Sequence, residues 1–82
     1  MDEAVIMDEV TAVLRDVFDQ PSLPVTPEMT AADVVGWDSL RMILILSALE
    51  ERLDLRFTTP EMDRLRCVGD LVRIIGQKRG GT

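Results

Sequence analysis

Apolar residues recur at helical spacing near the start of the chain. Between residues 3 and 18 they return every three or four positions, as they do on one face of an amphipathic helix. Asp2 provides a cap for this helix, and Glu3 suits the positive end of its dipole. The first predicted helix is defined by Ile6, Val10, Val13, Leu14, Val17 and Phe18.

A proline-rich segment separates the first predicted helix from the second. Residues 20–27 contain three prolines, and because proline cannot continue a helix we predict a long ordered loop. Residues 30–33 are expected to form a short turn that ends before Gly36.

The second predicted helix begins at Asp38 or Ser39 and ends near Leu53. Successive residues are rotated by about 100° around a helix axis, which gives this helix two apolar sides. A broad face, expected to supply the core, carries Met42, Ile43, Ile45, Leu46, Leu49 and Leu53. The opposite side carries Leu40, Leu44, Ala48 and Glu51.

Two further helices complete the predicted fold. Thr59, Pro60 and Glu61 follow the order of cap, proline and acid that starts a helix, so a short third helix is expected there. Val68, Leu71, Val72 and Ile75 define a last helix over residues 68–78, and no segment alternates as a strand would. We therefore predict an all-α fold, a small bundle of three main helices and one short one. Residues 1–78 are expected to form the only domain, and residues 79–82 a flexible C-terminal tail.

Charge and composition narrow the classes of partner and compartment. The net charge is −6, which argues against nucleic acid and anionic membranes as partners because both select basic surfaces. Residues 1–63 carry a net charge of −10 and residues 64–82 a net charge of +4, so the acidic part of the chain would attract basic partner surfaces.

The longest apolar run, residues 42–46, is too short to span a membrane, and no signal-peptide pattern begins the chain. A single cysteine fits a cytoplasmic protein, which we expect to be monomeric.

Catalysis is the weakest of the functions considered. The chain has no histidine, no tyrosine and one cysteine, so it lacks most general acids and bases. A Ser-His-Asp triad is excluded, and no metal site is expected. We predict that the protein is not an enzyme.

The candidate site is the segment from Gly36 to Leu40, where the loop meets the second helix. A serine at that point exposes its hydroxyl beside backbone N–H groups that have no partner within the helix. A phosphate esterified to Ser39 would lie at the favourable end of the helix dipole. Aspartate and serine are also the commonest helix caps, so Asp38-Ser39-Leu40 alone is more typical of a plain cap.

The chain resembles the acyl carrier protein family from Val5 to Ile75. The resemblance rests on Gly36-Trp-Asp-Ser-Leu40, Ala48-Leu-Glu-Glu-Arg-Leu-Asp-Leu-Arg-Phe57, Thr59-Pro-Glu-Met62 and Val68-Gly-Asp-Leu-Val72. It implies that Ser39 receives 4′-phosphopantetheine from coenzyme A. The terminal thiol would then carry acyl or aminoacyl groups as thioesters between separate enzymes.

The same resemblance implies roles for the neighbours of Ser39. Asp38 would help a phosphopantetheinyl transferase to hold its metal ion and coenzyme A, and Leu40 would contact partners beside the arm. We further expect that the enzymes that load and transfer acyl or aminoacyl groups contact Leu44, Ala48 and Glu51.

Three positions depart from the family pattern. Carriers of fatty acid synthesis place acids early in the second helix, where this chain has Arg41 and Leu44. This difference favours a specialised pathway, polyketide-type or amino-acid-activating, over general fatty acid synthesis. Cys67 stands where the family has Ser or Thr, and we interpret it as a small half-buried residue.

The alternative to a carrier function is that the protein is a small acidic helical adaptor without a prosthetic group.

Overall fold

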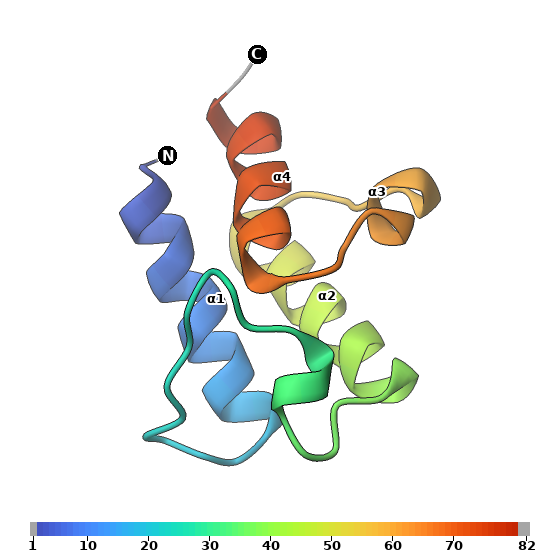
Figure 1. Ribbon diagram of the computed structural model, residues 1–82. Helices are drawn as coiled ribbons and strands as arrows, with labels where there is room; N and C mark the ends of the chain where they lie inside the picture. Colours follow the sequence, from blue (N-terminus) through green and yellow to red (C-terminus); the bar gives the residue numbers. More distant parts are fainter. Residues whose placement is uncertain (1, 81–82) are drawn as a thin grey trace.

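Four α-helices and one short 3₁₀ helix follow one another in the computed structural model, which describes residues 2–80 (Figure 1). No strand occurs within these residues, so the predicted all-α bundle is confirmed. In chain order the elements are α1 (Glu3–Val17), η1 (Ala31–Asp33), α2 (Ser39–Leu53), α3 (Thr59–Asp63) and α4 (Val68–Gly80).

The core lies where α1 packs against both α2 and α4 (Figure 1). Four of the six side chains predicted for the inner face of α1 are buried there and meet the buried residues of the other two long helices. Val17, the last residue of α1, and Phe18, its C-cap, are partly buried against this core. Such burial of aliphatic side chains is the main force that holds a small helical domain together. The most deeply buried side chains are Ile6, Val10, Leu14, Ile45, Leu49, Val68 and Ile75.

The prediction for Ile43 is wrong. It was expected in the core face of α2, but 60% of its surface is exposed, whereas Ile45, Leu46 and Leu49 are buried. Ile43 lies about 100° from Met42 around the axis, at the margin of the predicted face. The packing of α2 in the bundle covers a narrower stripe than the sequence suggests, and Ile43 falls outside it.

The long loop between α1 and α2 is held against the helices by hydrogen bonds to its backbone. Arg15 Nε of α1 donates to the carbonyl oxygen of Leu23 at 2.9 Å. The first two N–H groups of α4 donate to the loop as well, Val68 to Met29 O at 2.9 Å and Gly69 to Pro27 O at 2.8 Å. A Cβ atom on Gly69 would lie only 3.1 Å from that Pro27 oxygen, so glycine permits the close approach. These contacts fix the path along which the chain enters α2.

The cap of α3 lies one residue earlier than predicted. Thr58, not Thr59, is the cap: its hydroxyl accepts from the Glu61 N–H at 3.4 Å, and its own N–H donates to Glu61 Oε1 at 2.8 Å. This reciprocal pair is a capping box, in which the acid follows the cap by three positions. Lys78 Nζ of α4 lies 2.8 Å from the same carboxylate. The hydrogen bond from Lys78, followed by that from the Thr58 N–H, lowers the pKa of Glu61, so this carboxylate links α3 to α4.

The start of α4 brings Cys67 and Asp70 together. Cys67 is half-buried, as expected, and precedes the first residue of the helix. The Asp70 carboxylate accepts the Arg66 N–H at 3.1 Å. That bond is the main reason why the pKa of Asp70 is lowered; the positive charge of Arg73 lowers it further, and the nearby Cys67 thiol makes a smaller contribution. At its other end α4 reaches Gly80, two residues past the predicted end. Residues 81–82 of the predicted tail lie outside the described residues.

We expect Cys67→Ser to stabilise the fold by roughly 0.5–1 kcal/mol, the usual scale of a helix cap. A hydroxyl is a better donor to Asp70 than a thiol, and it can also accept from a free N–H group of the first turn, where sulfur is a poor acceptor. Chemical denaturation of the wild type, Cys67→Ser and Cys67→Ala measures the effect. The alanine variant, which has no cap, should not gain stability. A serine variant that is no more stable than the wild type would show that Cys67 acts as a core residue.

Candidate functional site

Ser39 is the first residue of α2, and it is exposed at the point where the long loop ends. Gly36, with a φ of +89°, turns the chain three residues earlier, in a region that glycine adopts without strain. The loop then runs through Trp37 and Asp38 directly into the helix. A modifying enzyme can therefore approach the Ser39 hydroxyl without opening the bundle.

Asp38 caps the helix that Ser39 begins. Its backbone is extended, and its Oδ1 accepts the Arg41 N–H at 2.9 Å. One of the first N–H groups of α2 is thus satisfied, while those of Ser39 and Leu40 have no acceptor within the helix because none precedes them. The capping role of Asp38 is confirmed, and its exposed carboxylate remains accessible to an enzyme.

The start of α2 fits a phosphodiester. The free N–H groups and the helix dipole favour negative charge there, and beyond the capping Asp38 the first turn contains no acidic residue. The exposed hydroxyl provides the oxygen for an ester bond. Ser39 would hold the phosphate covalently, and the free N–H groups beside it would offset its charge.

The side of α2 that faces away from the core exposes three large apolar residues. The exposed fractions are 57% for Leu40, 60% for Ile43 and 46% for Leu44, and the three residues lie on one side of the helix at the i, i+3 and i+4 positions. We call them the outer strip of α2. Glu51 is exposed further along this side, whereas Ala48 is half-buried and packs against the core. The structure thus brings Leu40, Leu44 and Glu51 to one surface, adds Ile43 to it and leaves Ala48 at its edge.

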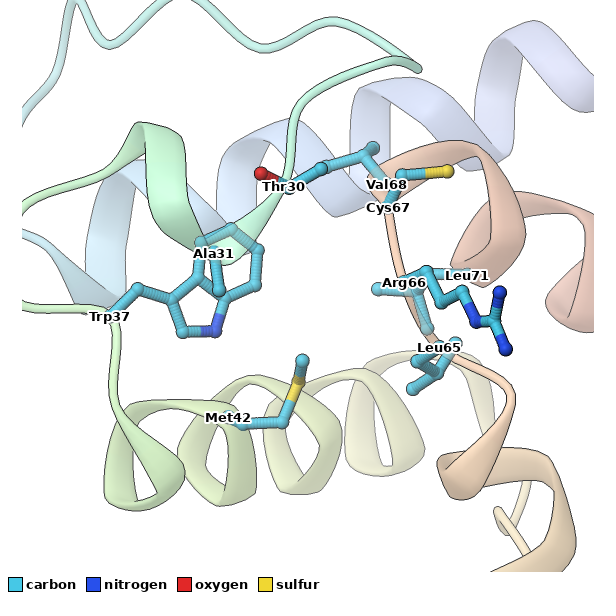
Figure 2. A pocket seen from close by; sticks show the side chains of 9 residues that line it. All are labelled: Thr30, Ala31, Trp37, Met42, Leu65, Arg66, Cys67, Val68 and Leu71. Atoms are coloured by element: carbon cyan, nitrogen blue, oxygen red, sulfur yellow. The ribbon is translucent and has the colours of Figure 1, made fainter.

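A cavity of about 50 Å³ lies between the loop, α2 and the connection from α3 to α4 (Figure 2). Trp37 forms one of its walls, and its ring is packed against Phe18 with the ring centroids 5.6 Å apart. The indole Nε1 is buried, and no acceptor for it exists among residues 2–80. An unsatisfied buried donor costs about 1–3 kcal/mol. The sequence did not predict this cavity, because its walls come from distant segments of the chain.

Within residues 2–80, no helix is both long enough and apolar enough to cross a membrane.

The chain has relatives of known family with the same helical architecture. A profile of the family described as "phosphopantetheine attachment site" matches residues 8–75. The acyl carrier protein of Acidothermus cellulolyticus is 31% identical over 70 residues, which cover 85% of this chain and 83% of the relative. That of Thermosynechococcus vestitus is 28% identical over 78 residues, which cover 95% and 96% of the two chains.

The fold matches that of a solved relative as well. The solution structure of holo acyl carrier protein from Geobacter metallireducens superimposes with a TM-score of 0.86 at 33% identity, and the match covers 92% of this chain and 86% of that one. Members of this family are carriers and not catalysts, and their prosthetic group is 4′-phosphopantetheine. The family profile spans most of the helical bundle, including the exposed serine that begins α2. The chain therefore belongs to the acyl carrier protein family.

Proposed function

We propose that Ser39 carries the 4′-phosphopantetheine arm and that the protein presents acyl or aminoacyl thioesters on it to separate enzymes. One observation carries this proposal: the hydroxyl of Ser39 is exposed at the first residue of α2, directly after the capping Asp38, in a helix whose first turn contains no acidic residue. The family profile includes this position within residues 8–75. Of the three serines in the chain, Ser39 alone begins a helix.

The chemistry of attachment needs only the hydroxyl from this chain. Ser39 Oγ attacks the phosphorus of coenzyme A that bears the pantetheine, the bond from that phosphorus to the adenosine-side phosphate breaks, and adenosine 3′,5′-bisphosphate leaves. The hydroxyl proton passes to a base of the transferase. Asp38 holds the helix start in place and offers a carboxylate toward the metal ion of the transferase. Once attached, the arm supplies a terminal thiol that holds cargo as a thioester.

The outer strip of α2 is the surface we assign to the enzymes that load and unload the arm. It begins one residue after Ser39, so an enzyme that reaches the arm lies over Leu40 and Leu44. Glu51, exposed on the same side, is placed to meet a basic residue at the edge of such a contact. The net charge of −10 on residues 1–63 would speed the encounter with a basic partner surface.

The apolar character of this strip favours a specialised pathway of the polyketide or amino-acid-activating type. Leu44, where carriers of fatty acid synthesis bear an acid, is 46% exposed. An exposed leucine at that position offers an apolar contact to a partner in place of a charge. Arg41, two residues after the serine, reverses the charge expected there.

The proposal is tested by incubating the purified protein with coenzyme A, Mg²⁺ and a phosphopantetheinyl transferase of broad specificity. Intact mass spectrometry should show the addition of one phosphopantetheine, and peptide mapping should assign it to the peptide that contains Ser39. The alternative function, an acidic adaptor without a prosthetic group, predicts an unchanged mass. An unchanged mass with an active transferase, shown by modification of a known carrier in the same tube, would contradict the proposal.

A further inference from the structure

Arg41 places a positive charge in the first turn of α2, where the other helices have acids. The first turn of each of the other three α-helices contains an acid, Glu3, Glu61 or Asp70, whereas that of α2 contains none and has Arg41 as its third residue. The dipole of a helix favours negative charge at its start and disfavours positive charge there. Arg41 therefore costs α2 stability, and the local rules of helix formation do not explain its presence.

The guanidinium of Arg41 has no partner within residues 2–80. Three other cations of these residues form ion pairs, and Arg15 donates to a backbone carbonyl, but the side chain of Arg41 makes neither kind of contact. Asp38, three residues earlier, accepts the backbone N–H of Arg41 at 2.9 Å instead of pairing with its guanidinium. The side chain is nevertheless half-buried. A cation that is partly withdrawn from water calls for a counter-charge, and here the counter-charge has to come from outside the described residues.

The arm on Ser39 is not placed to provide that counter-charge. Residues two positions apart are separated by about 200° around a helix axis, so the side chains of Ser39 and Arg41 leave α2 on nearly opposite sides. Arg41 instead begins a row along the outer side of the helix, at the i, i+3, i+7 and i+10 positions. The other members of this row are Leu44, Ala48 and Glu51.

The row has opposite charges at its two ends. Arg41 lies in the first turn, and Glu51 follows ten residues later, which corresponds to about 15 Å along the axis. Leu44, which is 46% exposed, and the half-buried Ala48 lie between them. A surface that matches this row has an acid near the arm, then an apolar patch, then a base. Because docking in the reverse direction would bring like charges together, the row also determines which way a partner lies along α2.

We infer that Arg41 is a recognition residue, and that the enzymes that serve this carrier present a carboxylate to it beside the arm. The inference rests on the proposed function and adds the chemistry of the partner to it. An enzyme with a basic residue at this place meets Arg41 with a like charge and is rejected. Arg41 thus contributes to specificity twice, by attracting the cognate enzyme and by repelling enzymes that are adapted to an acid.

Reversal of the charge at Arg41 tests this inference with two enzymes as probes. One is the enzyme of the host that loads cargo onto the arm, purified by that activity. The other is a malonyl transferase of fatty acid synthesis, whose own carriers have an acid early in the second helix. Arg41→Glu should lower kcat/KM with the host enzyme about tenfold and raise it with the malonyl transferase by a similar factor. Arg41→Lys keeps the charge and should behave as the wild type with both enzymes.

Arg79→Glu is the matched control, because it makes the same change of charge in the last turn of α4. Its rates should equal those of the wild type with both enzymes. Two measurements on the protein itself separate recognition from other roles. Arg41→Glu should melt at a higher temperature than the wild type, because an acid replaces a base at the positive end of the helix dipole. Arg41→Gln should leave the ³¹P signal of the attached arm unchanged, because the guanidinium does not pair with the phosphodiester.

The possible failures are distinct. If intact mass shows no arm on Ser39, the proposed function falls and this inference falls with it. If the arm is present but either rate changes no more for Arg41→Glu than for Arg79→Glu, only this inference is overturned. A lower melting temperature for Arg41→Glu would show that Arg41 stabilises the fold, and a shifted ³¹P signal in Arg41→Gln would show that it binds the arm. Either of these results would also overturn the inference.

Discussion

Replacing Ser39 with alanine is expected to abolish attachment of the arm completely, while the fold is retained. The oxygen of Ser39 forms the ester bond, and alanine offers no nucleophile in its place. The helix keeps its start, because Asp38 and not Ser39 accepts the Arg41 N–H. Surface substitutions of this kind usually change stability by no more than about 0.5 kcal/mol. Intact mass after treatment with coenzyme A and a transferase should therefore show no added phosphopantetheine, and the thermal melt should stay near that of the wild type.

The chain provides matched controls for this experiment. Ser47 is exposed on the same helix, and Ser22 is exposed in the long loop, so alanine at either position makes the same chemical change elsewhere. Both variants should accept one arm as the wild type does. Modification of the Ser39→Ala protein, or loss of modification in one of the two controls, would move the attachment site to another serine and remove the basis of the proposed function.

Replacing Leu44 with glutamate is expected to reduce transfer of cargo to the cognate enzyme tenfold or more, about 1.4 kcal/mol. The side chain is 46% exposed on the outer strip of α2, where an apolar pocket of a partner would have to accept a desolvated carboxylate. Folding and modification of Ser39 should persist, because the core side of α2 is not touched. The same change restores the acid of fatty-acid carriers, so transfer to fatty-acid enzymes should increase.

Val5→Glu is the control for the effect of charge. Val5 lies on α1 and has the same exposed fraction, 46%, so the substitution adds an equal charge at an equally exposed apolar position away from the outer strip. Its transfer kinetics should match those of the wild type. The measurement is the rate of loading or transfer on the modified proteins, accompanied by thermal melts. If Leu44→Glu unfolds the domain, Leu44 belongs to the core. If the variant folds and transfers cargo at the wild-type rate, the partner contacts another surface.

Local patterns were sufficient to predict the helices and the start of the site. The periodic apolar residues of α1, the prolines of the loop and the polar residues before α2 each act within one or two turns of chain. The same local rules were also sufficient to identify the correct cap of α3. Thr58 precedes Glu61 by the three positions that a capping box requires. The prediction instead placed the cap at Thr59, because this residue directly precedes Pro60.

Features that depend on packing were beyond those patterns. The angular position of Ile43 was known from the sequence, but not how much of α2 the rest of the bundle would cover. The bundle covers a narrower part of α2 than the pattern suggests, and Ile43 is left 60% exposed. The cavity depends on segments from Thr30 to Leu71, whose distances no local rule supplies. That residues 2–80 hold no acceptor for the buried indole N–H of Trp37 is seen only when those segments are assembled.

Mass spectrometry of the protein isolated from its own host tests the central claim most directly. The account predicts that the peptide containing Ser39 carries one phosphopantetheine, and that part of the population bears an acyl or aminoacyl group on its thiol. Neutral hydroxylamine should release this group, as expected of a thioester. A protein that is unmodified at Ser39 in a host whose other carriers are modified would contradict the account.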